Sequence, residues 1–501
     1  MSERFVAEIT LVTGGGGGTT TFYAATSGWS TKPTDTPANT HIPARLKSAG
    51  TLQRELFSGR RVAGRTRASY GELAILNDDG AYDLWLGYGV AGCAVTVRMG
   101  DEAAAYPAGY TTVYVGRVLS LVADTSTLRV RLRDALEQLD RPVLTESFTG
   151  TGGLEGSSAV ADRLKQFVSS DPGYIEPILT DSATQIYYVQ STGTGGTGAG
   201  FAAYSGGVEI TRGADYPDAA TCVSTPPSAG QCRFWLGVGG AGPVYVRLAA
   251  APDYDLRVKP LGYQASGAAW TMPAFAARAG IAGGSGSLQL SAQLIEGAST
   301  TYADALDDAC AYQFGYYGMS RLGAFACGVF SVPGGSPVAT FDVHNAWGWQ
   351  RESPQDMDAP VWSVSVSAGR TWPSNVQAAA TATLKDHMGR APWWCSFAGT
   401  NPATLTDNPG AEAAIIEMRG RYFQTLADQT NFLAAYFSRF GVRRDVVQCT
   451  VQLTAAMLAV ELHDTVQIKL PRFGFDAGRN MRVITQRIDC DRREITFGCW
   501  G

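Results

Sequence analysis

The sequence predicts a multidomain protein that is mainly β, with a few short helices inserted between its β domains. Its 501 residues are too many for one hydrophobic core and indicate roughly three or four domains. Glycine is abundant, with 59 residues, which is typical of chains with many tight turns. Apolar and polar residues alternate over many short stretches, as in Leu128–Arg133, where every second residue is an arginine. A period of two is that of a strand with one buried face.

The N-terminal part contains many of these alternating stretches. Phe5–Val12 is predicted to be a strand, followed by a turn at Gly14–Gly18. Thr26–Pro43 is a long loop rich in Ser, Thr and Pro, whose length indicates an exposed or interface segment. Asn77–Gly80 has the composition of a hairpin turn, and Asp134–Val143 that of a short helical turn ended by a proline. Further strands are expected at Leu73–Ile75, Val95–Val97, Thr112–Val115, Val118–Val122 and Leu128–Leu132.

The middle of the chain begins at a glycine-rich joint, Gly150–Gly156. Ser157 or Ser158 is expected to cap an amphipathic helix that continues to Val168. Ser191–Gly207 is predicted to be a linker within a small β domain. The strands of that domain are expected at Tyr174–Leu179, Ile186–Val189, Val208–Thr211, Cys232–Gly237 and Pro243–Leu248.

Two helices and a hairpin are predicted next. One helix covers Pro273–Gly280, and another begins at Thr301, where Thr301-x-x-Asp304 has the pattern of a capping box, and continues to about Phe314. Arg321–Gly323 is the expected turn of the hairpin, and Ala326–Ser331 its return strand.

The last domain is predicted to start with the strand Val361–Val366. Asp428 is expected to cap its helix, which has an apolar stripe and stops at Gly441. The closing strands are indicated by alternation at Val466–Leu470 and Ile495–Cys499. The final strand is expected to close a barrel or sandwich.

Motifs at both ends of the chain point to one family. Near the C-terminus stand a strand of the type lGD-V-l (Leu462–Val466), a PRFG loop (Pro471–Gly474) and a final strand ending in Trp500-Gly501. His463 occupies the position where the first motif usually has glycine. An N-terminal pattern is matched at Gly71, Glu72, Asn77, Asp79, Gly80, Gly92, Gly100, Gly116, Arg133, Asp134, Leu139, Arg141 and Pro142. In both patterns the chain resembles the central hub proteins in the tail tips of long-tailed, non-contractile phages and gene transfer agents.

The resemblance implies two related tail-tube-like β-barrel domains, at residues 1–145 and 346–501. An inserted small β domain (146–260) and a helix-plus-hairpin module (261–345) would lie between them. It also implies a homotrimer, in which three chains place six barrels in a ring that joins a six-fold tail tube to three-fold tip fibres and gates the channel for genome ejection. The implied partners are a distal tail protein ring, a tape-measure protein and tail fibre or tip proteins, with DNA present only in transit. Such a chain would be made and assembled in the bacterial host cytoplasm and would end in the virion tail tip.

Composition disfavours several other classes of protein. A net charge of −5 does not suit a protein that holds nucleic acid by counter-ion release, and the basic run Arg60–Arg67 is interpreted as a solvated or interface loop. No uninterrupted apolar stretch approaches the ~18 residues that a membrane span needs, so membrane insertion is not expected. The nine cysteines include no C-x-x-C pair and are interpreted as buried free thiols of a protein made in a reducing cytosol. Whether Cys222 and Cys232 form a disulfide stays open.

No catalytic, cofactor-binding or metal site is predicted, so the chain is not expected to be an enzyme. The four histidines share no metal-ligand spacing. The acidic pair Asp78 and Asp79 is assigned to a hairpin turn, and the cluster Asp304, Asp307 and Asp308 to the start of a helix, where carboxylates favour the helix dipole.

A group of tryptophans supports an alternative hypothesis. Trp347, Trp349, Trp393 and Trp394 are candidates for a subunit interface or a sugar-stacking platform. The alternative is therefore a carbohydrate-binding β-sandwich protein or a glycoside hydrolase on the phage or cell surface. A hydrolase needs two carboxylates about 5 to 10 Å apart across a cleft. Oligomeric order separates the two hypotheses, because only the hub requires a ring.

Overall fold

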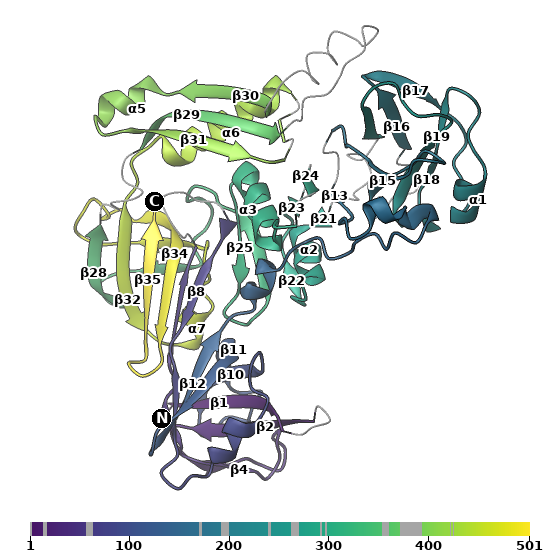
Figure 1. Cartoon of the computed structure of the whole chain (residues 1–501). Coiled ribbons are helices and arrows are strands. Elements are labelled where there is room, and N and C mark those ends of the chain that lie inside the picture. Colours follow the sequence, from purple (N-terminus) through teal and green to yellow (C-terminus); the bar gives the residue numbers. More distant parts are fainter. Residues whose placement is uncertain are drawn as a thin grey trace.

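The structure, a computed structural model, describes residues 3–13, 18–56, 64–169, 173–191, 200–238, 242–261, 270–290, 293–295, 298–352, 360–370, 393–420, 422–423 and 425–501. Strands dominate these residues and short helices lie between them, so the predicted fold class is confirmed. Figure 1 shows the N-terminal sheet at the bottom and the C-terminal sheet above it. The helices α2 (Met272–Arg278) and α3 (Tyr302–Gln313) lie beside the C-terminal sheet, with the inserted β domain beyond them.

The N-terminal sheet has the strand order β2-β1-β10-β11-β12-β9-β5, and all its neighbours pair antiparallel. Its strands are β1 (Glu3–Val12), β2 (Thr19–Ala25), β5 (Leu46–Ser48), β9 (Leu73–Leu76), β10 (Ala94–Asp101), β11 (Thr111–Ala123) and β12 (Thr127–Arg133). The alternation in β12 places Leu128 and Val130 in the core, fully buried, while Arg129 and Arg131 remain half exposed. The strand predictions for this region are confirmed.

The C-terminal sheet has the order β27-β33-β34-β35-β32-β28, with β6 and β8 attached beside β34. These strands are β6 (Thr51–Glu55), β8 (Arg67–Tyr70), β27 (Ala339–Phe341), β28 (Ala346–Glu352), β32 (Val446–Gln452), β33 (Thr465–Ile468), β34 (Arg479–Asp489) and β35 (Glu494–Trp500). The predicted closing strands are thus confirmed. The N-terminal and C-terminal sheets are both half-barrels, and one apolar cluster extends through them from Phe5 to Cys499.

The two sheets repeat one arrangement of five strands. In the first, β5, β9, β10, β11 and β12 follow one another along the chain and lie in the order β5-β9-β12-β11-β10. In the second, β28, β32, β33, β34 and β35 follow one another and lie in the order β28-β32-β35-β34-β33. All neighbours in both sets are antiparallel. We call these sets the N-terminal repeat and the C-terminal repeat.

The same irregularity interrupts both repeats. The ladder between β11 and β12 shifts register between Val118 and Ser120, and the ladder between β34 and β35 shifts between Val483 and Thr485. Each shift is a β-bulge, which adds one residue to the long central strand and bends it. The two bulges fix the correspondence between the repeats residue by residue.

A matching turn precedes the third strand of each repeat, β10 in the first and β33 in the second. The amide N–H of Gly92 donates to Val118 O at 2.8 Å, and that of His463 donates to Val483 O at 2.8 Å. Gly92 has φ +80° and His463 has φ +74°, a left-handed conformation that normally favours glycine. The histidine that replaces the motif's glycine therefore keeps the turn. Its ring is held in place because Nε2 accepts a hydrogen bond from Ser331 N at 3.2 Å.

The inserted β domain forms a sheet with the order β14-β15-β19-β18-β17-β16-β20. Its elements are β14 (Ile178–Asp181), β15 (Ile186–Gln190), β16 (Gly200–Ser205), β17 (Val208–Arg212), α1 (Ala219–Ser224), β18 (Gln231–Trp235), β19 (Val244–Leu248) and β20 (Leu256–Leu261). The linker prediction for Ser191–Gly207 is wrong at its C-terminal end. β16 lies there because β17 and β20 pair with it on both sides, which the local composition does not reveal.

The helix predicted from Ser157 to Val168 is also wrong. Ser157 does cap a turn, but that turn is the 3-10 helix η4 (Ser158–Val160) alone. The chain then extends into β13 (Phe167–Ser169), which pairs with β24 (Gln293–Ile295). Burial of Phe167 against the helix-plus-hairpin module outweighs the helical periodicity.

The helix-plus-hairpin module follows the prediction closely. α2 and α3 are confirmed, and α3 has a complete capping box between Thr301 and Asp304. The hairpin strands are β25 (Gly315–Met319) and β26 (Phe325–Val329). Short strands β21 (Trp270–Thr271), β22 (Gly284–Ser285) and β23 (Gln289–Leu290) complete the module, and β7 (Gly64–Arg65) adds to β25.

A small layer lies above the C-terminal sheet in Figure 1. It contains β29 (Val361–Arg370), β30 (Trp393–Thr400) and β31 (Glu412–Met418) in the order β30-β29-β31, with α5 (Pro402–Asp407) and α6 (Leu426–Phe440). The predicted strand at Val361 is confirmed. The cap of α6 is Thr425 rather than Asp428, because Thr425 Oγ1 accepts from Asp428 N at 3.2 Å, and Asp428 is the third residue of a capping box.

Two features of the N-terminal half differ from a simple hairpin pattern. Asn77–Gly80 forms a turn, but β9 pairs with β12 and β5, so the hairpin prediction is wrong. Asn77 Oδ1 accepts from Tyr82 N at 2.8 Å, and the chain continues into the 3-10 helix η1 (Asp83–Gly87). The loop Thr26–Pro43 contains the short pair β3 (Trp29–Ser30) and β4 (His41–Ile42), and the helical turn after β12 is η2 (Leu136–Asp140).

The predicted domain limits at residues 145, 260 and 345 stay predictions. Strands pair across them: β6 and β8, from the N-terminal part, join the C-terminal sheet, and β27 pairs with β33. The predicted turn at Gly14–Gly18 lies almost wholly outside the described residues.

Candidate assembly site at the junction of the repeats

Strand β6 extends the C-terminal sheet along the outer side of β34. It lies between β5 and β9 in the chain, yet it pairs antiparallel with β34 from Thr51 opposite Asp489 to Glu55 opposite Thr485. Leu52 lies opposite Ile488, and both side chains are fully buried. The backbone of the N-terminal part thus occupies the sheet edge of the C-terminal repeat, which is the mode of β-strand addition.

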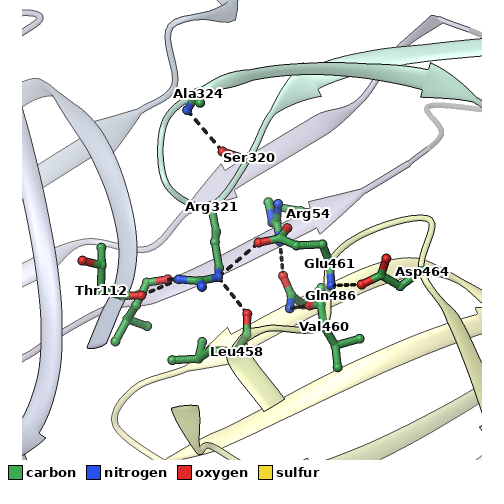
Figure 2. A network of polar contacts seen from close by, with 11 residues as sticks. Arg54, Thr112, Ser320, Arg321, Ala324, Leu458, Val460, Glu461, Asp464 and Gln486 are labelled. Carbon is green, nitrogen blue, oxygen red and sulfur yellow. Dashed lines mark hydrogen bonds and ion pairs between the residues drawn. The ribbon is translucent and has the colours of Figure 1, made fainter. Parts of the chain in front are cut away.

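A buried polar pair continues the same face of β6. Arg54 is 3% exposed, and its Nη2 contacts Glu461 Oε2 at 2.6 Å and donates to Gln486 Oε1. Gln486 is fully buried, and its Nε2 donates to Val460 O at 2.8 Å. Figure 2 shows these side chains converging on Glu461. A buried charge of this kind is tolerated only when it is paired and hydrogen-bonded.

Arg321 brings a third part of the chain to Glu461. Its Nε donates to Leu458 O at 2.8 Å and lies 3.1 Å from Glu461 Oε1. Its Nη1 donates to Val113 O at 3.3 Å and to Thr112 O in β11 (Figure 2). Burial lowers the pKa of the Arg321 guanidinium, and the charge of Glu461 opposes that effect.

One guanidinium therefore connects the hairpin turn, the N-terminal sheet and the loop between β32 and β33. The side chain of Arg321 is only 10% exposed. Its own carbonyl also accepts from Val115 N at 2.7 Å, so backbone and side chain fasten the hairpin to β11 together. We call Arg54, Arg321, Glu461 and Gln486 the junction cluster.

The turn between β34 and β35 makes a second contact between the repeats. Asp491 Oδ2 accepts from Ser48 Oγ at 2.5 Å, and its Oδ1 accepts from Ala49 N at 3.1 Å. Arg493 Nη2 donates to Glu3 O at 2.7 Å. Together with the junction cluster, these bonds hold the two repeats side by side.

The carboxylates on α3 serve as connectors. Asp304 completes the capping box, as predicted, but Asp307 and Asp308 lie beyond the first turn of α3, so their assignment to the helix start is wrong. Asp307 accepts from Arg65 N at 3.1 Å, and Asp308 accepts from Arg419 N at 2.7 Å and from Tyr422 Oη at 2.8 Å. Burial raises the pKa of both Asp307 and Asp308. The helix is thereby joined to β7 on one side and to the layer of β29, β30 and β31 on the other.

The tryptophans singled out in the sequence lie on two different sheets. Trp347 and Trp349 are on β28, where Trp347 is 43% exposed. Trp349 is partly buried, and its Nε1 donates to Ala346 O at 3.1 Å. Trp393 and Trp394 begin β30, and their side chains lie outside the described residues. The interface and glycan roles of all four stay predictions.

Of the remaining charged candidates, Asp79 and Arg65 form ion pairs. Asp79 pairs with Arg45, whose guanidinium holds the pKa of that carboxyl well below its usual range. Arg65 contacts Asp140 at 2.6 Å, while Arg60 and Arg61 lie outside the described residues. Within the described ranges, no group of three or more His, Cys, Asp or Glu side chains is placed to hold a metal ion.

The nine cysteines are free, and eight are buried, as the sequence suggested. Cys222 and Cys232 both belong to this buried set, so the structure contains no disulfide between them. Burial raises the pKa of both thiols to about 11. Among the helices of the described residues, none is both long enough and apolar enough to span a membrane.

The junction cluster was not anticipated from the sequence, although one signal was present. Leu52 and Arg54 in β6, and Leu56 directly after it, are buried at every second position, so a strand of period two places an arginine on its buried face. A charge at an inward position indicates a buried partner. Arg321 and Glu461 carry no comparable signal, because each stands in a turn or loop.

Comparison with known proteins finds likeness in structure rather than in sequence. No family model and no curated protein matches the chain. The structural neighbours are tail and virion proteins. The tail protein from Neisseria meningitidis MC58 is 8% identical, with 99% of this chain and 96% of that chain covered and a TM-score of 0.42. The 43 kDa tail protein of prophage MuSo2 from Shewanella oneidensis is 11% identical, with the same coverage and a TM-score of 0.39.

A chain from the virion of a native gene transfer agent particle is 12% identical, with 70% of this chain and 89% of that chain covered and a TM-score of 0.40. Likeness at this level carries no argument about activity or partners.

Proposed function

We propose that the chain is a structural virion protein that forms the trimeric central hub of a phage tail tip. The observation that carries the proposal is the internal repeat, in which five strands with one order and connectivity occur twice. Three chains with two equivalent domains each present six similar units with three-fold symmetry. Such a ring matches a six-fold tube on one face and three-fold tip fibres on the other.

The partners follow from that place in the virion. They are other copies of the chain, a distal tail protein ring, a tape-measure protein and fibre or tip proteins. DNA passes through the central channel, which the hub opens for genome ejection. The acidic net charge of −5 suits a channel wall that does not retain DNA. The role is non-enzymatic, and assembly takes place in the host cytoplasm.

The test is the mass and symmetry of the purified chain. Light scattering is expected to give a particle of three times the 53.1 kDa chain mass. Negative-stain class averages are expected to show six similar lobes around a centre with three-fold symmetry. A stable particle with another number of chains, or without six lobes, contradicts the proposal.

One observation favours a second candidate function, carbohydrate binding. Trp347 is 43% exposed on β28, an outer strand of its sheet, and an exposed indole face can stack on a sugar ring. A glycan array probed with the wild-type chain and with Trp347→Ala tests it. Glycan binding that the substitution abolishes, by a chain that stays monomeric, would favour this candidate over the hub.

A further inference from the structure

The two repeats differ in what lies beside their long central strands. Beyond its bulge, β34 has β35 on one side and β6 on the other. Leu56 N donates to Ile484 O at 2.8 Å, and Cys490 N donates to Gly50 O at 3.3 Å, so hydrogen bonds flank this ladder at both ends. The C-terminal repeat therefore has no free edge at this position within the described chain.

Within the described residues, the same position of the N-terminal repeat has no strand on its outer side. Pairing of β10 with β11 ends at Arg117, after which only Val118 bonds to the preceding turn. From Leu119 to Ala123, β12 is the single strand that pairs with β11 in the described part of the chain. We call Leu119–Ala123 the β11 edge.

The hydrogen-bonding groups of this edge point outward. Asp124 N donates to Thr127 O at 2.9 Å, which makes that pair hydrogen-bonded. Hydrogen-bonded and non-hydrogen-bonded pairs alternate along an antiparallel ladder. The N–H and C=O groups of Leu121 and Ala123 therefore face away from β12, as the equivalent groups of Gln486 and Ile488 face β6.

Two large apolar side chains of the β11 edge are exposed, whereas Ser120 and Leu121 are partly buried. Leu119 is 45% exposed and Val122 is 40% exposed. Ile484, the equivalent of Leu119 in β34, is only 7% exposed beside the segment that contains β6. Proteins normally protect such an edge with charges, proline or a covering segment. Leu119–Ala123 contains neither charge nor proline. A strand from elsewhere would bury this edge.

We propose that the β11 edge receives a strand from a second copy of this chain. Within one chain, the segment between β5 and β9 supplies β6 to the C-terminal repeat. The counterpart segment of the C-terminal repeat lies between β28 and β32, and its described strands β29, β30 and β31 pair with one another. If a strand from that segment pairs with the β11 edge of the next chain, it plays the part there that β6 plays beside β34. Every contact between neighbouring domains of the ring is then of the same kind.

This inference rests on the proposed ring and identifies the contact that closes it. A head-to-tail contact closes a ring when its rotation divides a full turn evenly. The contact within the chain, between β6 and β34, and the contact between chains, at the β11 edge, then alternate around six domains.

Photo-crosslinking in the full chain tests the contact directly. A photo-reactive amino acid is placed at Val122 and, as the matched control, at Arg487, its equivalent in β34. The control is expected to crosslink within the chain to the peptide that contains Gln53, which lies opposite Arg487. The probe at Val122 is expected to crosslink to residues 353–445 of a second copy, as shown by mass spectrometry of mixed heavy and light chains.

The oligomeric state of the same samples separates the two proposals. Trimers without a cross-chain product at Val122 overturn the β11-edge contact and leave the hub intact. A cross-chain product in a particle that is not three-fold supports the edge contact and overturns the ring. A chain that does not associate at any concentration overturns both.

A pair of substitutions provides an independent measurement. Ala123→Pro removes an N–H that faces outward, whereas Ala123→Ser keeps it. We expect the proline variant to lose affinity between chains by about tenfold or more, with an unchanged circular dichroism spectrum, and the serine variant to assemble normally. Equal assembly of the two folded variants contradicts the proposal.

Discussion

Replacing Arg321 with methionine tests whether the junction cluster holds the modules together. Methionine keeps the apolar length of the side chain but removes every hydrogen bond to Leu458 O, Val113 O and Thr112 O. Each buried carbonyl that loses its donor costs about 1 to 3 kcal/mol, and the cost is smaller for a carbonyl that water can reach in the variant. Removing one member of a buried ionic network typically costs about 3 to 5 kcal/mol. We expect about 3 kcal/mol for Arg321→Met.

Hydrogen exchange is the suitable assay, because a multidomain chain does not unfold in one step. The reporter is the amide of Val115, which donates to Arg321 O. A loss of about 3 kcal/mol corresponds to exchange that is about a hundredfold faster at this amide. Exchange at β15, in the inserted domain, should not change.

A surface arginine provides the matched control. Arg131 contacts Glu72 at 2.7 Å, but its side chain is 53% exposed, so Arg131→Met should cost about 1 kcal/mol or less. A double-mutant cycle of Arg321→Met with Glu461→Gln should show coupling between the two sites. If Arg321→Met accelerates exchange no more than Arg131→Met does, the proposed role of the junction cluster is refuted.

Three further predictions concern burial. Burial, with a smaller effect of Arg482, lowers the pKa of His463 from 6.5 to about 4. As pH falls, the unfolded chain therefore binds the proton before the folded chain does. The free energy of unfolding should drop by about 3 kcal/mol between pH 7 and 4. A His463→Asn variant in a pH series of thermal melts should lose that dependence. Gly318→Ala would place its Cβ against the Thr66 side chain and should lower stability by about 1 to 3 kcal/mol in denaturant titrations, with partial rescue by Thr66→Ala. A thiol reagent should label Cys93 in the native chain, and the eight buried cysteines only after denaturation; fast native labelling of more than one thiol would contradict the packing.

The sequence predicted the strands and helices that local chemistry specifies. The alternation in β12 and the capping pattern at Thr301 were sufficient, because side-chain periodicity and a capping box act within a few residues. The same reasoning failed for β16, whose stretch has linker composition, and for the residues after Ser157. In both places a partner strand distant in the sequence decides the conformation.

The aromatic candidates show a different limit. Periodicity and composition could select Trp347 and Trp349 but could not separate an exposed indole from one that packs on the core. The two residues stand on the same strand, and the bulge between Trp347 and Gln350 changes the face that each presents. Only the pairing of β28 with β32 specifies that bulge.

By itself the sequence determined that this protein is β-rich, where many of the strands in its two end sheets lie, and which motifs mark its two ends. Tertiary structure alone decided that the two end domains share one strand order, that β6 joins the opposite sheet, and that Arg54 meets Glu461 across 407 positions of the chain. The physical reason is range. Alternation and capping depend on neighbouring residues, whereas the partner of a strand edge or a buried charge is chosen by the packing of the whole chain.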